Sequence, residues 1–218
     1  MVDSFARGYA FILEGDTEKA FYLSFLNYLA QKNNATLQRT VDTEVPDVGY
    51  LLYHNDVVDL IKMHVVNSIS QMPRTANWVH THCTGRYGRG KDWSVFLCYD
   101  TDDYQEDVTP FLEGDWDILR KKIRRVNRVI DVAARADIED AMLTDLAGIC
   151  GFLGVEEVSK DQLTGRKGKA RMKALFRAHG AYYHSGDRAR PMIDTLDMQK
   201  IIDESQLPLQ EIERIIFG

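Results

Sequence analysis

Two aspartates that follow a run of apolar residues are the part of this sequence best suited to chemistry. Residues 95–99 read Val-Phe-Leu-Cys-Tyr, and Asp100, Asp102 and Asp103 come directly after them. An uninterrupted apolar run of this length predicts a strand that is buried on both faces. Because side chains two positions apart in a strand point the same way, Asp100 and Asp102 are expected to lie side by side.

Neighbouring carboxylates repel each other unless a cation or a hydrogen-bond donor lies between them. A hard cation such as Mg²⁺ prefers oxygen ligands and keeps several waters, so the aspartates predict a metal or phosphate site. The alternative is that these acids cap the next helix or form a solvated turn, because aspartate is favoured at both places. Open α/β sheets bind their ligands at the carboxyl ends of strands, and this favours the metal site.

A second acid ends a strand near the start of the chain. Residues 8–15 read Gly-Tyr-Ala-Phe-Ile-Leu-Glu-Gly, which predicts a buried strand that ends on Glu14. The apolar spacing after Gly15 predicts a helix to about residue 31. Good capping chemistry explains the polar residues 16–18 at the start of this helix, but it does not explain Glu14.

A third unit of the same kind follows later in the chain. Residues 128–134 predict a strand, Asp137 is a suitable cap for the next helix, and Glu139 lies in the first turn of that helix. Three strand–turn–helix units build a Rossmann-like α/β fold, with a mostly parallel central sheet and helices on both faces. This arrangement predicts that Glu14, Asp100, Asp102 and Glu139 lie near one edge of the sheet.

The rest of the chain completes a single predicted domain over residues 1–218. Its core spans about 8–155, and a helical C-terminal extension spans about 160–218. A further strand is predicted over 36–45. The apolar spacing over 57–69 predicts a helix in which His64 packs rather than binds a ligand.

Basic residues gather in three segments, over 85–91, 120–128 and 163–173. Near an acidic metal site such segments are candidates for phosphate contact, although solvated faces and ordinary surface loops have the same composition. The candidate contacts are Arg86, Arg89, Lys91, Arg124, Arg125, Lys167, Lys169 and Arg171. His80, His82 and Cys83 have the residue types of zinc ligands, but no second ligand pair follows at a standard spacing, so no zinc site is predicted.

Composition sets limits on the function. The 218 residues carry 27 Lys and Arg against 33 Asp and Glu, a formal net charge of −6, which argues against a protein that coats nucleic acid by bulk attraction. No apolar stretch approaches the roughly 20 residues that span a bilayer, and the N-terminus lacks the pattern of a secretory signal. The three cysteines are far apart and odd in number, which favours a reducing cytoplasm over a disulfide framework.

The two acidic turns together resemble the Toprim family. Residues 12–15, Ile-Leu-Glu-Gly, and residues 96–102, Phe-Leu-Cys-Tyr-Asp-Thr-Asp, match its two motifs in their order. The longer string over 13–22, Leu-Glu-Gly-Asp-Thr-Glu-Lys-Ala-Phe-Tyr, is similar to small free-standing Toprim proteins and to the nuclease domain of OLD-type proteins. Residues 136–143 resemble their later acidic helix start, with Ala141 or Met142 where those groups usually have Trp.

The resemblance implies Mg²⁺- or Mn²⁺-dependent phosphodiester hydrolysis, and therefore a nuclease that acts on DNA or RNA. Asp100 and Asp102 would hold the metal, Glu14 would assist a second ion or act as general acid or base, and Glu139 would be a further ligand. Asp103 would position these groups without binding the metal itself. The resemblance also implies a role in bacterial anti-phage defence beside a partner ATPase; a homo-oligomer is left open, and no membrane partner is expected.

Other functions remain as alternatives. A metal-dependent nucleotide-sugar transferase also uses Asp-x-Asp after a buried strand, but it leaves Glu14 and Gly15 unexplained. A phosphatase with an aspartate nucleophile usually has Thr or Val where this chain has Tyr104. A non-catalytic Toprim module that binds a partner ATPase or nucleic acid would keep the fold without cutting.

Overall fold

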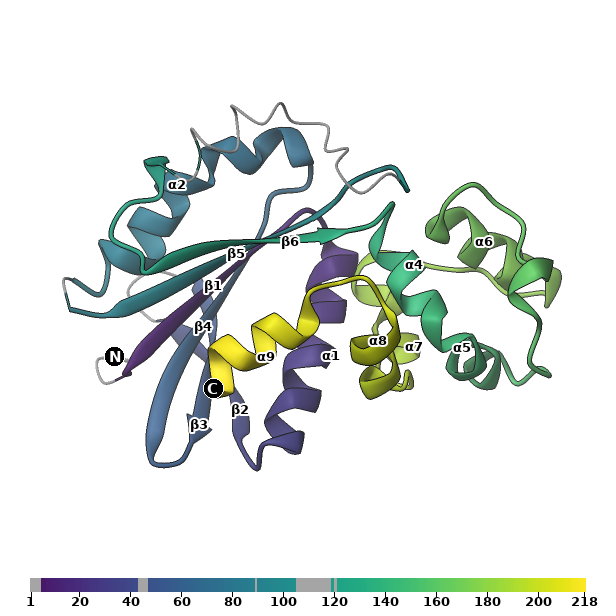
Figure 1. Cartoon of the computed structure of the whole chain (residues 1–218), viewed down its shortest axis with the longest axis horizontal. Helices are drawn as coiled ribbons and strands as arrows, with labels where there is room; N and C mark the ends of the chain where they lie inside the picture. The colour runs from purple at the N-terminus through teal and green to yellow at the C-terminus, as the bar shows by residue number, and fades with distance from the viewer. Residues whose placement is uncertain (1–4, 43–46, 89, 105–118, 120) are drawn as a thin grey trace. The chain divides into compact units, whose positions relative to one another are not determined.

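The computed structural model describes residues 5–42, 47–88, 90–104, 119 and 121–218 (Figure 1). Its strands are β1 (Arg7–Leu13), β2 (Thr36–Asp42), β3 (Asp47–His54), β4 (Val57–Val65), β5 (Asp92–Asp100) and β6 (Arg128–Ala134). Its α-helices are α1 (Asp16–Lys32), α2 (Thr75–Val79), α4 (Ile138–Met142), α5 (Leu146–Leu153), α6 (Gly168–Ala178), α7 (Arg190–Ile193), α8 (Met198–Glu204) and α9 (Leu209–Phe217).

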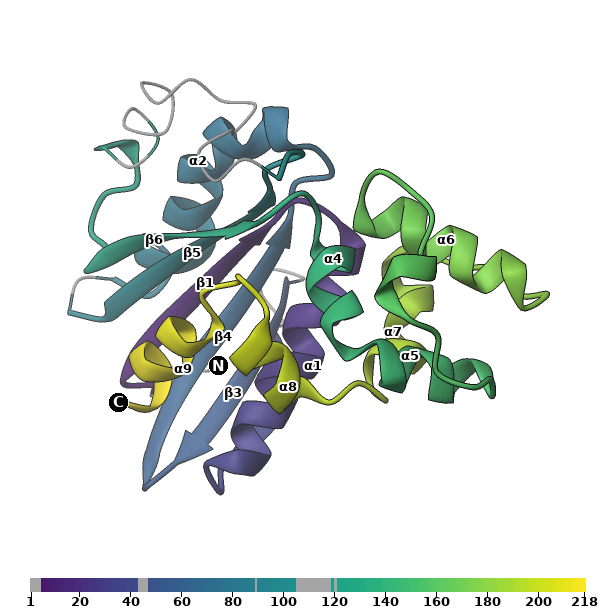
Figure 2. The same cartoon turned by 45° about the vertical axis from the view of Figure 1, so that its right-hand side comes forward.

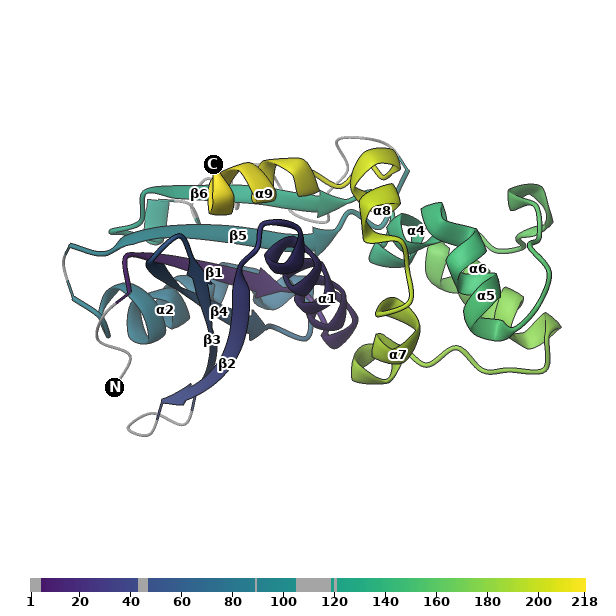
Figure 3. The ribbon, with the colours of Figure 1, turned by 90° about the horizontal axis from the view of Figure 1, so that it is seen from below.

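The strands form one six-stranded sheet in the order β2-β3-β4-β1-β5-β6. Strand β1 pairs in parallel with β4 on one side and with β5 on the other. Strand β6 runs the same way, because Asn127 N donates to Trp93 O at one end and Thr101 N donates to Ala134 O at the other (Figures 1 and 3). Strand β3 is antiparallel to both of its neighbours. The predicted α/β class, with a mostly parallel sheet and a helical C-terminal part, is confirmed.

The two motif-bearing strands lie at the centre of the sheet. Residues 9–13 of β1 and residues 93–99 of β5 are almost completely buried, and the rings of Phe11 and Phe96 stack with their centroids 4.6 Å apart. Gly8 pairs with Trp93 across these strands, and a Cβ at Gly8 would overlap the indole ring. The glycine therefore leaves the space in which Trp93 is fully buried.

The chain divides into two compact units. Among the described residues, the first unit comprises those of Met1–Gly15, Leu26–Cys98 and Phe111–Val132. The second unit comprises those of Asp16–Phe25, Tyr99–Pro110 and Ala133–Gly218. The sheet lies mainly in the first unit, and the last residues of β5 and β6 enter the second.

The helix predicted over 57–69 is wrong, because residues 57–65 form strand β4. Its apolar residues fit a helical repeat as well as a strand, and pairing with β1 and β3 on its two sides decides between them. The sequence analysis also missed β3, which joins β4 through Asn55 and Asp56. Both residues have positive φ angles, of 48° and 61°, as a two-residue hairpin turn requires.

An aromatic stack ties helix α2 to strand β4 in the first unit. The Trp78 ring lies between the rings of His64 and His82, at centroid distances of 4.6 and 5.1 Å. Asp47 Oδ2 accepts a hydrogen bond from Lys62 Nζ at 2.9 Å and lies 3.1 Å from His82 Nδ1. Burial lowers the pKa of His64, so this histidine is a neutral packing residue at pH 7.

The second unit is built from short helices (Figure 2). Within the helical extension predicted over about 160–218, α7 and α8 are separate helices, because Asp197 caps a new helix start by accepting from Lys200 N at 3.0 Å. Asp145 Oδ2 accepts from Asp197 N at 2.8 Å and holds this start in place. Helix α9 ends the helical part and buries Leu209, Ile212 and Ile216.

Two further observations concern the described residues as a set. Within them, no helix is long and apolar enough to cross a bilayer. Cys83, Cys98 and Cys150 are buried, and no disulfide joins them.

The ion pair of Arg7 and Asp59 gives a first test of the sheet. Arg7 Nη2 donates to Asp59 Oδ2 at 2.7 Å, and the Asp59 side chain is 2% exposed. Replacing Arg7 by Met is expected to lower the free energy of unfolding by about 2–4 kcal/mol, because a buried charge loses its partner. Urea denaturation measures this change.

Arg214→Met is the matched control, because Arg214 forms an ion pair with Glu211 at the surface. This variant is expected to change the free energy of unfolding by less than about 0.5 kcal/mol. Equal effects of the two substitutions would contradict a structural role for the Arg7–Asp59 pair.

Candidate active site

The turn that follows β5 carries the two aspartates of the Asp-x-Asp motif. Asp100 is the last residue of the strand and is half-buried, whereas the Asp102 side chain is 61% exposed. Asp102 has a φ of 62°, a left-handed conformation that Asp and Asn tolerate better than most residues. The strand conformation therefore ends before Asp102, and the turn rather than the strand sets where its carboxylate lies.

Hydrogen bonds join this turn to the turn that follows β6. Asp102 N donates to Ala136 O at 2.9 Å, and Ala136 N donates to Asp103 O at 2.8 Å. The Thr101 hydroxyl accepts from Ala136 N at 2.9 Å and donates to Asp103 O at 2.8 Å. Thr101 is buried and Ala136 has a φ of 63°, so both turns have one defined conformation. We refer to them as the paired turns.

The paired turns bring Asp100 to the start of helix α4. Asp100 Oδ1 accepts a hydrogen bond from Ile138 N at 3.0 Å. Asp137 is the N-cap of the same helix and accepts from Asp140 N at 3.0 Å, as the sequence predicted. The Asp100 carboxylate thus accepts from a backbone N–H, and that N–H belongs to a helix that starts 38 residues later in the chain.

The acids of α4 also hold the start of helix α6. Asp140 Oδ2 accepts from Gly168 N at 2.9 Å, and Asp137 Oδ2 accepts from Lys169 N at 3.0 Å. These two N–H groups would otherwise have no partner within the helix. A Cβ at Gly168 would overlap Asp140 N and Asp137 Oδ1, so only glycine allows this close approach of the two helices.

Basic residues just before α6 and in its first turns contact the acids directly. Lys167 Nζ lies 2.6 Å from Asp102 Oδ1, and Arg171 Nη1 lies 3.1 Å from Asp140 Oδ1. Tyr104 donates its hydroxyl to Asp140 Oδ2 at 2.8 Å, and the Arg171 guanidinium lies over the Tyr104 ring. Burial and the hydrogen bond to Asp140 raise the pKa of Tyr104 to about 12, so it remains a donor at pH 7.

Glu139 is the most deeply buried acid of the candidate site. It is 2% exposed, and its Oε1 accepts a hydrogen bond from the Tyr183 hydroxyl at 3.1 Å. Burial, and next the charge of Asp137, raise the pKa of Glu139. Burial likewise raises the pKa of Asp137. Glu139 therefore keeps its proton to a higher pH than an exposed glutamate does.

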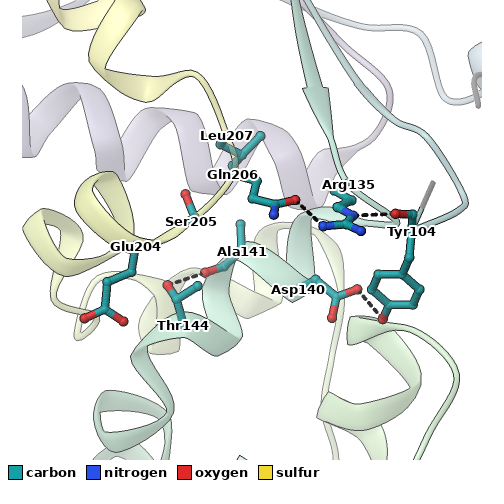
Figure 4. A pocket seen from close by; sticks show the side chains of 9 residues that line it. All are labelled: Tyr104, Arg135, Asp140, Ala141, Thr144, Glu204, Ser205, Gln206 and Leu207. Atoms are coloured by element: carbon teal, nitrogen blue, oxygen red, sulfur yellow. Dashed lines mark hydrogen bonds between the residues drawn. The ribbon is translucent and has the colours of Figure 1, made fainter. Parts of the chain in front are cut away.

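A pocket with a volume of about 190 Å³ opens beside Asp140 (Figure 4). Arg135 crosses it, donating from Nε to Tyr104 O and from Nη1 to Gln206 Oε1 at 2.8 Å. Figure 4 shows the Asp140 carboxylate directed at the Tyr104 hydroxyl on one side of this pocket. The pocket thus borders the acidic network through Asp140 and Tyr104.

The residues predicted for catalysis fall into both units. Asp100, Asp102 and Glu139 belong to the second unit, where the paired turns and helix α4 hold them. Glu14 belongs to the first unit and directly follows β1, and its N–H donates to Cys98 O at 3.2 Å. Glu14 remains a candidate on the strength of its motif.

The described residues that were predicted to contact phosphate also lie in both units. Lys167 and Arg171 pair with carboxylates of the second unit, and the backbone N–H of Lys169 is bonded to Asp137. Lys91 Nζ donates to Phe5 O and lies over the Phe5 ring, so it has a packing role. Arg86, Arg124 and Arg125 lie in the first unit, and Arg89 lies outside the described residues.

The donor set at the end of β5 suits a hard cation. Two carboxylates supply oxygen ligands, and Mg²⁺ is commonly held by one or two protein carboxylates with water and substrate phosphate completing its shell. Within the described part of the chain, no group of three His, Cys, Asp or Glu side chains is arranged to hold a metal ion.

Four participants in this network were not predicted from the sequence. Tyr104, Arg135 and Asp140 have no motif of their own. Tyr183 contacts Glu139 across 44 positions of sequence, a separation that no local pattern reveals. The nearest sequence signal was the glycine at 168 inside a basic segment, which marks a close backbone approach.

Gly168 gives a direct test of the contact between α4 and α6. Gly168→Ala is expected to lower the free energy of unfolding by about 1–3 kcal/mol, because the methyl group would overlap Asp140 and Asp137. Gly151→Ala in helix α5 is the matched control, since a Cβ there meets no neighbour. The control is expected to stabilise the protein by about 0.5–1 kcal/mol. The same sign in both variants by urea denaturation would contradict the proposed contact.

The raised pKa of Glu139 predicts a pH dependence of stability. Below the ordinary glutamate pKa of about 4.3 both states hold the proton; as the pH rises toward the raised pKa, the unfolded chain loses it first and folding becomes less favourable. Glu139→Gln removes this loss and keeps an oxygen acceptor for Tyr183. The variant is expected to gain stability over wild type between pH 4 and pH 7, measured by urea denaturation in EDTA. A difference that does not change with pH would contradict the assignment.

Comparisons with known proteins identify no family for this chain. No family model matches the chain, and no curated protein matches it. Among solved structures, the chain is similar to the crystal structure of a hypothetical protein from Pyrococcus horikoshii OT3. The two share 12% sequence identity with a TM-score of 0.48, and the match covers 97% of this chain and 100% of the other.

Proposed function

We propose that this protein is a Mg²⁺-dependent phosphodiester hydrolase, a nuclease that acts on DNA or RNA. The observation that carries the proposal is the position of Asp100 and Asp102 at the carboxyl end of β5, in paired turns that also bring Lys167 to Asp102. The resemblance of residues 12–15 and 96–102 to the two Toprim motifs supports the same activity.

Each group of the site would have a defined task. Asp100 and Asp102 would hold Mg²⁺, which when bound supplies positive charge that stabilises the developing charge on the phosphate and activates water. Lys167 would bind a phosphate oxygen next to Asp102, since its Nζ already lies against that carboxylate. Glu14 would act as general acid or base, the role that its motif implies.

The acids behind these groups would keep them in position. Asp137 and Asp140 bind the first N–H groups of α6 and so place the segment that carries Lys167. Glu139 is buried, which raises its pKa, and the Tyr183 hydroxyl donates a hydrogen bond to it. A rigid supporting layer of this kind holds reactive groups in a productive arrangement. The proposed partners, an ATPase and a second copy of the chain, and the proposed role in anti-phage defence extend this activity by analogy.

The test is cleavage of labelled single- and double-stranded DNA and RNA in Mg²⁺, Mn²⁺ or EDTA. Asp100→Asn and Asp102→Asn remove one negative charge each and are expected to slow metal-dependent cutting at least about a hundredfold. Asn suits both positions, because its side-chain oxygen can still accept from Ile138 N and because Asn tolerates the φ of Asp102. Glu14→Gln tests the first motif in the same assay.

Asp203→Asn is the control, because Asp203 is exposed on α8 and accepts only a local hydrogen bond from Gln199 at 2.9 Å among the bonds described. It is expected to cut at the wild-type rate. Cutting that persists in EDTA, or that is unchanged in both the Asp100 and Asp102 variants, would rule out the proposed mechanism. Turnover of a nucleotide sugar without cleavage of nucleic acid would favour the transferase instead.

A further inference from the structure

A second feature of the molecule, in the first unit, is a pocket with a volume of about 390 Å³ whose lining is basic. We call it the basic pocket. It lies between helix α2 with the turn after it and the segment that leads into β6. Its lining residues are Ala76, Asn77, His80, Lys122, Arg124 and Arg125.

The described residues that line the basic pocket include cations and no carboxylate. Three of the six residues are Lys or Arg, and Asn77 and His80 can add side-chain N–H donors. No carboxylate is among the lining residues described, and Lys122, Arg124 and Arg125 form no ion pair with any residue that the structure describes. All three cations are exposed, so their charges are available to a ligand that arrives from solvent.

The cations lie on an anchored segment. Ile123, between Lys122 and Arg124, is 4% exposed and its N–H donates to Leu119 O at 3.0 Å. Asn127 N donates to Trp93 O at 2.7 Å and joins the segment to β5. The backbone between these anchors includes Arg125, which has a φ of 62°. The backbone that carries the two arginines is therefore held at both ends.

The opposite wall is also fixed. Helix α2 is held by Trp78, both faces of whose ring are covered by histidines. Lys62 forms an ion pair with Asp47 within the unit, and His82 Nδ1 lies 3.1 Å from the same carboxylate. His80 lies two positions before His82 and lines the basic pocket instead. The two histidines of the His-x-His run thus have different surroundings.

The lining of the basic pocket suits phosphate groups. Arginine forks match phosphate oxygens with two parallel hydrogen bonds, and lysine adds a point charge. The pocket volume exceeds the roughly 30 Å³ of one water molecule more than tenfold, which leaves room for a phosphate with an attached sugar. Because the whole chain has a net charge of −6, this local cluster rather than bulk charge would attract a polyanion.

We propose that the basic pocket binds the phosphate backbone of a nucleic acid strand, with Arg124 and Arg125 as its principal contacts. The ligand class rests on the proposed nuclease function, whereas the site itself rests on the pocket. Contacts to phosphate carry no sequence information, so binding through this pocket is independent of base sequence.

The experiment measures binding of fluorescein-labelled DNA and RNA oligonucleotides by anisotropy, in EDTA and over a series of salt concentrations. The double variant Arg124→Gln, Arg125→Gln is expected to bind at least about tenfold more weakly and to reduce the slope of log affinity against log salt by about 2. Asn77→Asp places a negative charge on the opposite wall and is expected to weaken binding as well. Thermal melting checks that each variant is folded.

The double variant Lys121→Gln, Arg128→Gln is the matched control. It removes the same charge from exposed neighbours that do not line the pocket, and it is expected to bind as wild type does. Equal weakening by the two double variants would assign the effect to bulk charge and overturn the proposal. Failure of the wild type to bind any oligonucleotide would overturn it too.

Competition distinguishes a strand from a single nucleotide. Unlabelled oligonucleotide is expected to displace the probe at a far lower phosphate concentration than a mononucleotide or inorganic phosphate, and equal displacement would contradict binding of a strand. The outcome is separable from the nuclease proposal. A protein that binds through the pocket but never cuts contradicts only the nuclease, and one that cuts and binds equally well without Arg124 and Arg125 contradicts only the pocket.

Discussion

The hydrogen bonds between the turns after β5 and β6 determine where the acids of the second unit lie. Ala136 N donates to the Thr101 hydroxyl and to Asp103 O, Asp102 N donates to Ala136 O, and two residues in left-handed conformations make the bends possible. Buried backbone donors and acceptors must be paired, so the two turns can form only together. The end of β5 is thereby coupled to the start of α4, although the two are far apart in sequence.

A series of hydrogen bonds leads from these turns through α4 and α6 back to the end of β5. Asp100 accepts from the first N–H of α4, the acids of α4 accept from the first N–H groups of α6, and Lys167 just before α6 contacts Asp102. The exposed Lys167–Asp102 pair adds little stability by itself, so its importance lies in position. A cation and two carboxylates are held at one strand end by groups that are themselves hydrogen-bonded.

The acids of the second unit and the cations of the basic pocket in the first unit differ in how deeply they are buried. In the second unit Asp137 and Glu139 are buried and Asp140 is half-buried, and burial raises the pKa of Glu139 and Asp137. In the first unit the cations of the basic pocket are exposed and meet no carboxylate among the residues described there. The proposed nuclease would use both kinds of group, carboxylates to hold a metal and cations to bind the phosphate backbone.

The sequence by itself determined the α/β class, the strands β1, β5 and β6, the burial of β1 and β5, and the acids at the ends of those two strands. Long apolar runs and capping residues are local signals, and these elements are decided by local signals. The tertiary structure decided the rest. Residues 57–65 became a strand because two neighbouring strands pair with them, and Asp140, Tyr104 and Tyr183 joined the site through contacts that span 28 to 44 positions. Such contacts depend on how helices pack and on a glycine that lets two of them approach, and periodicity along the chain carries no record of either.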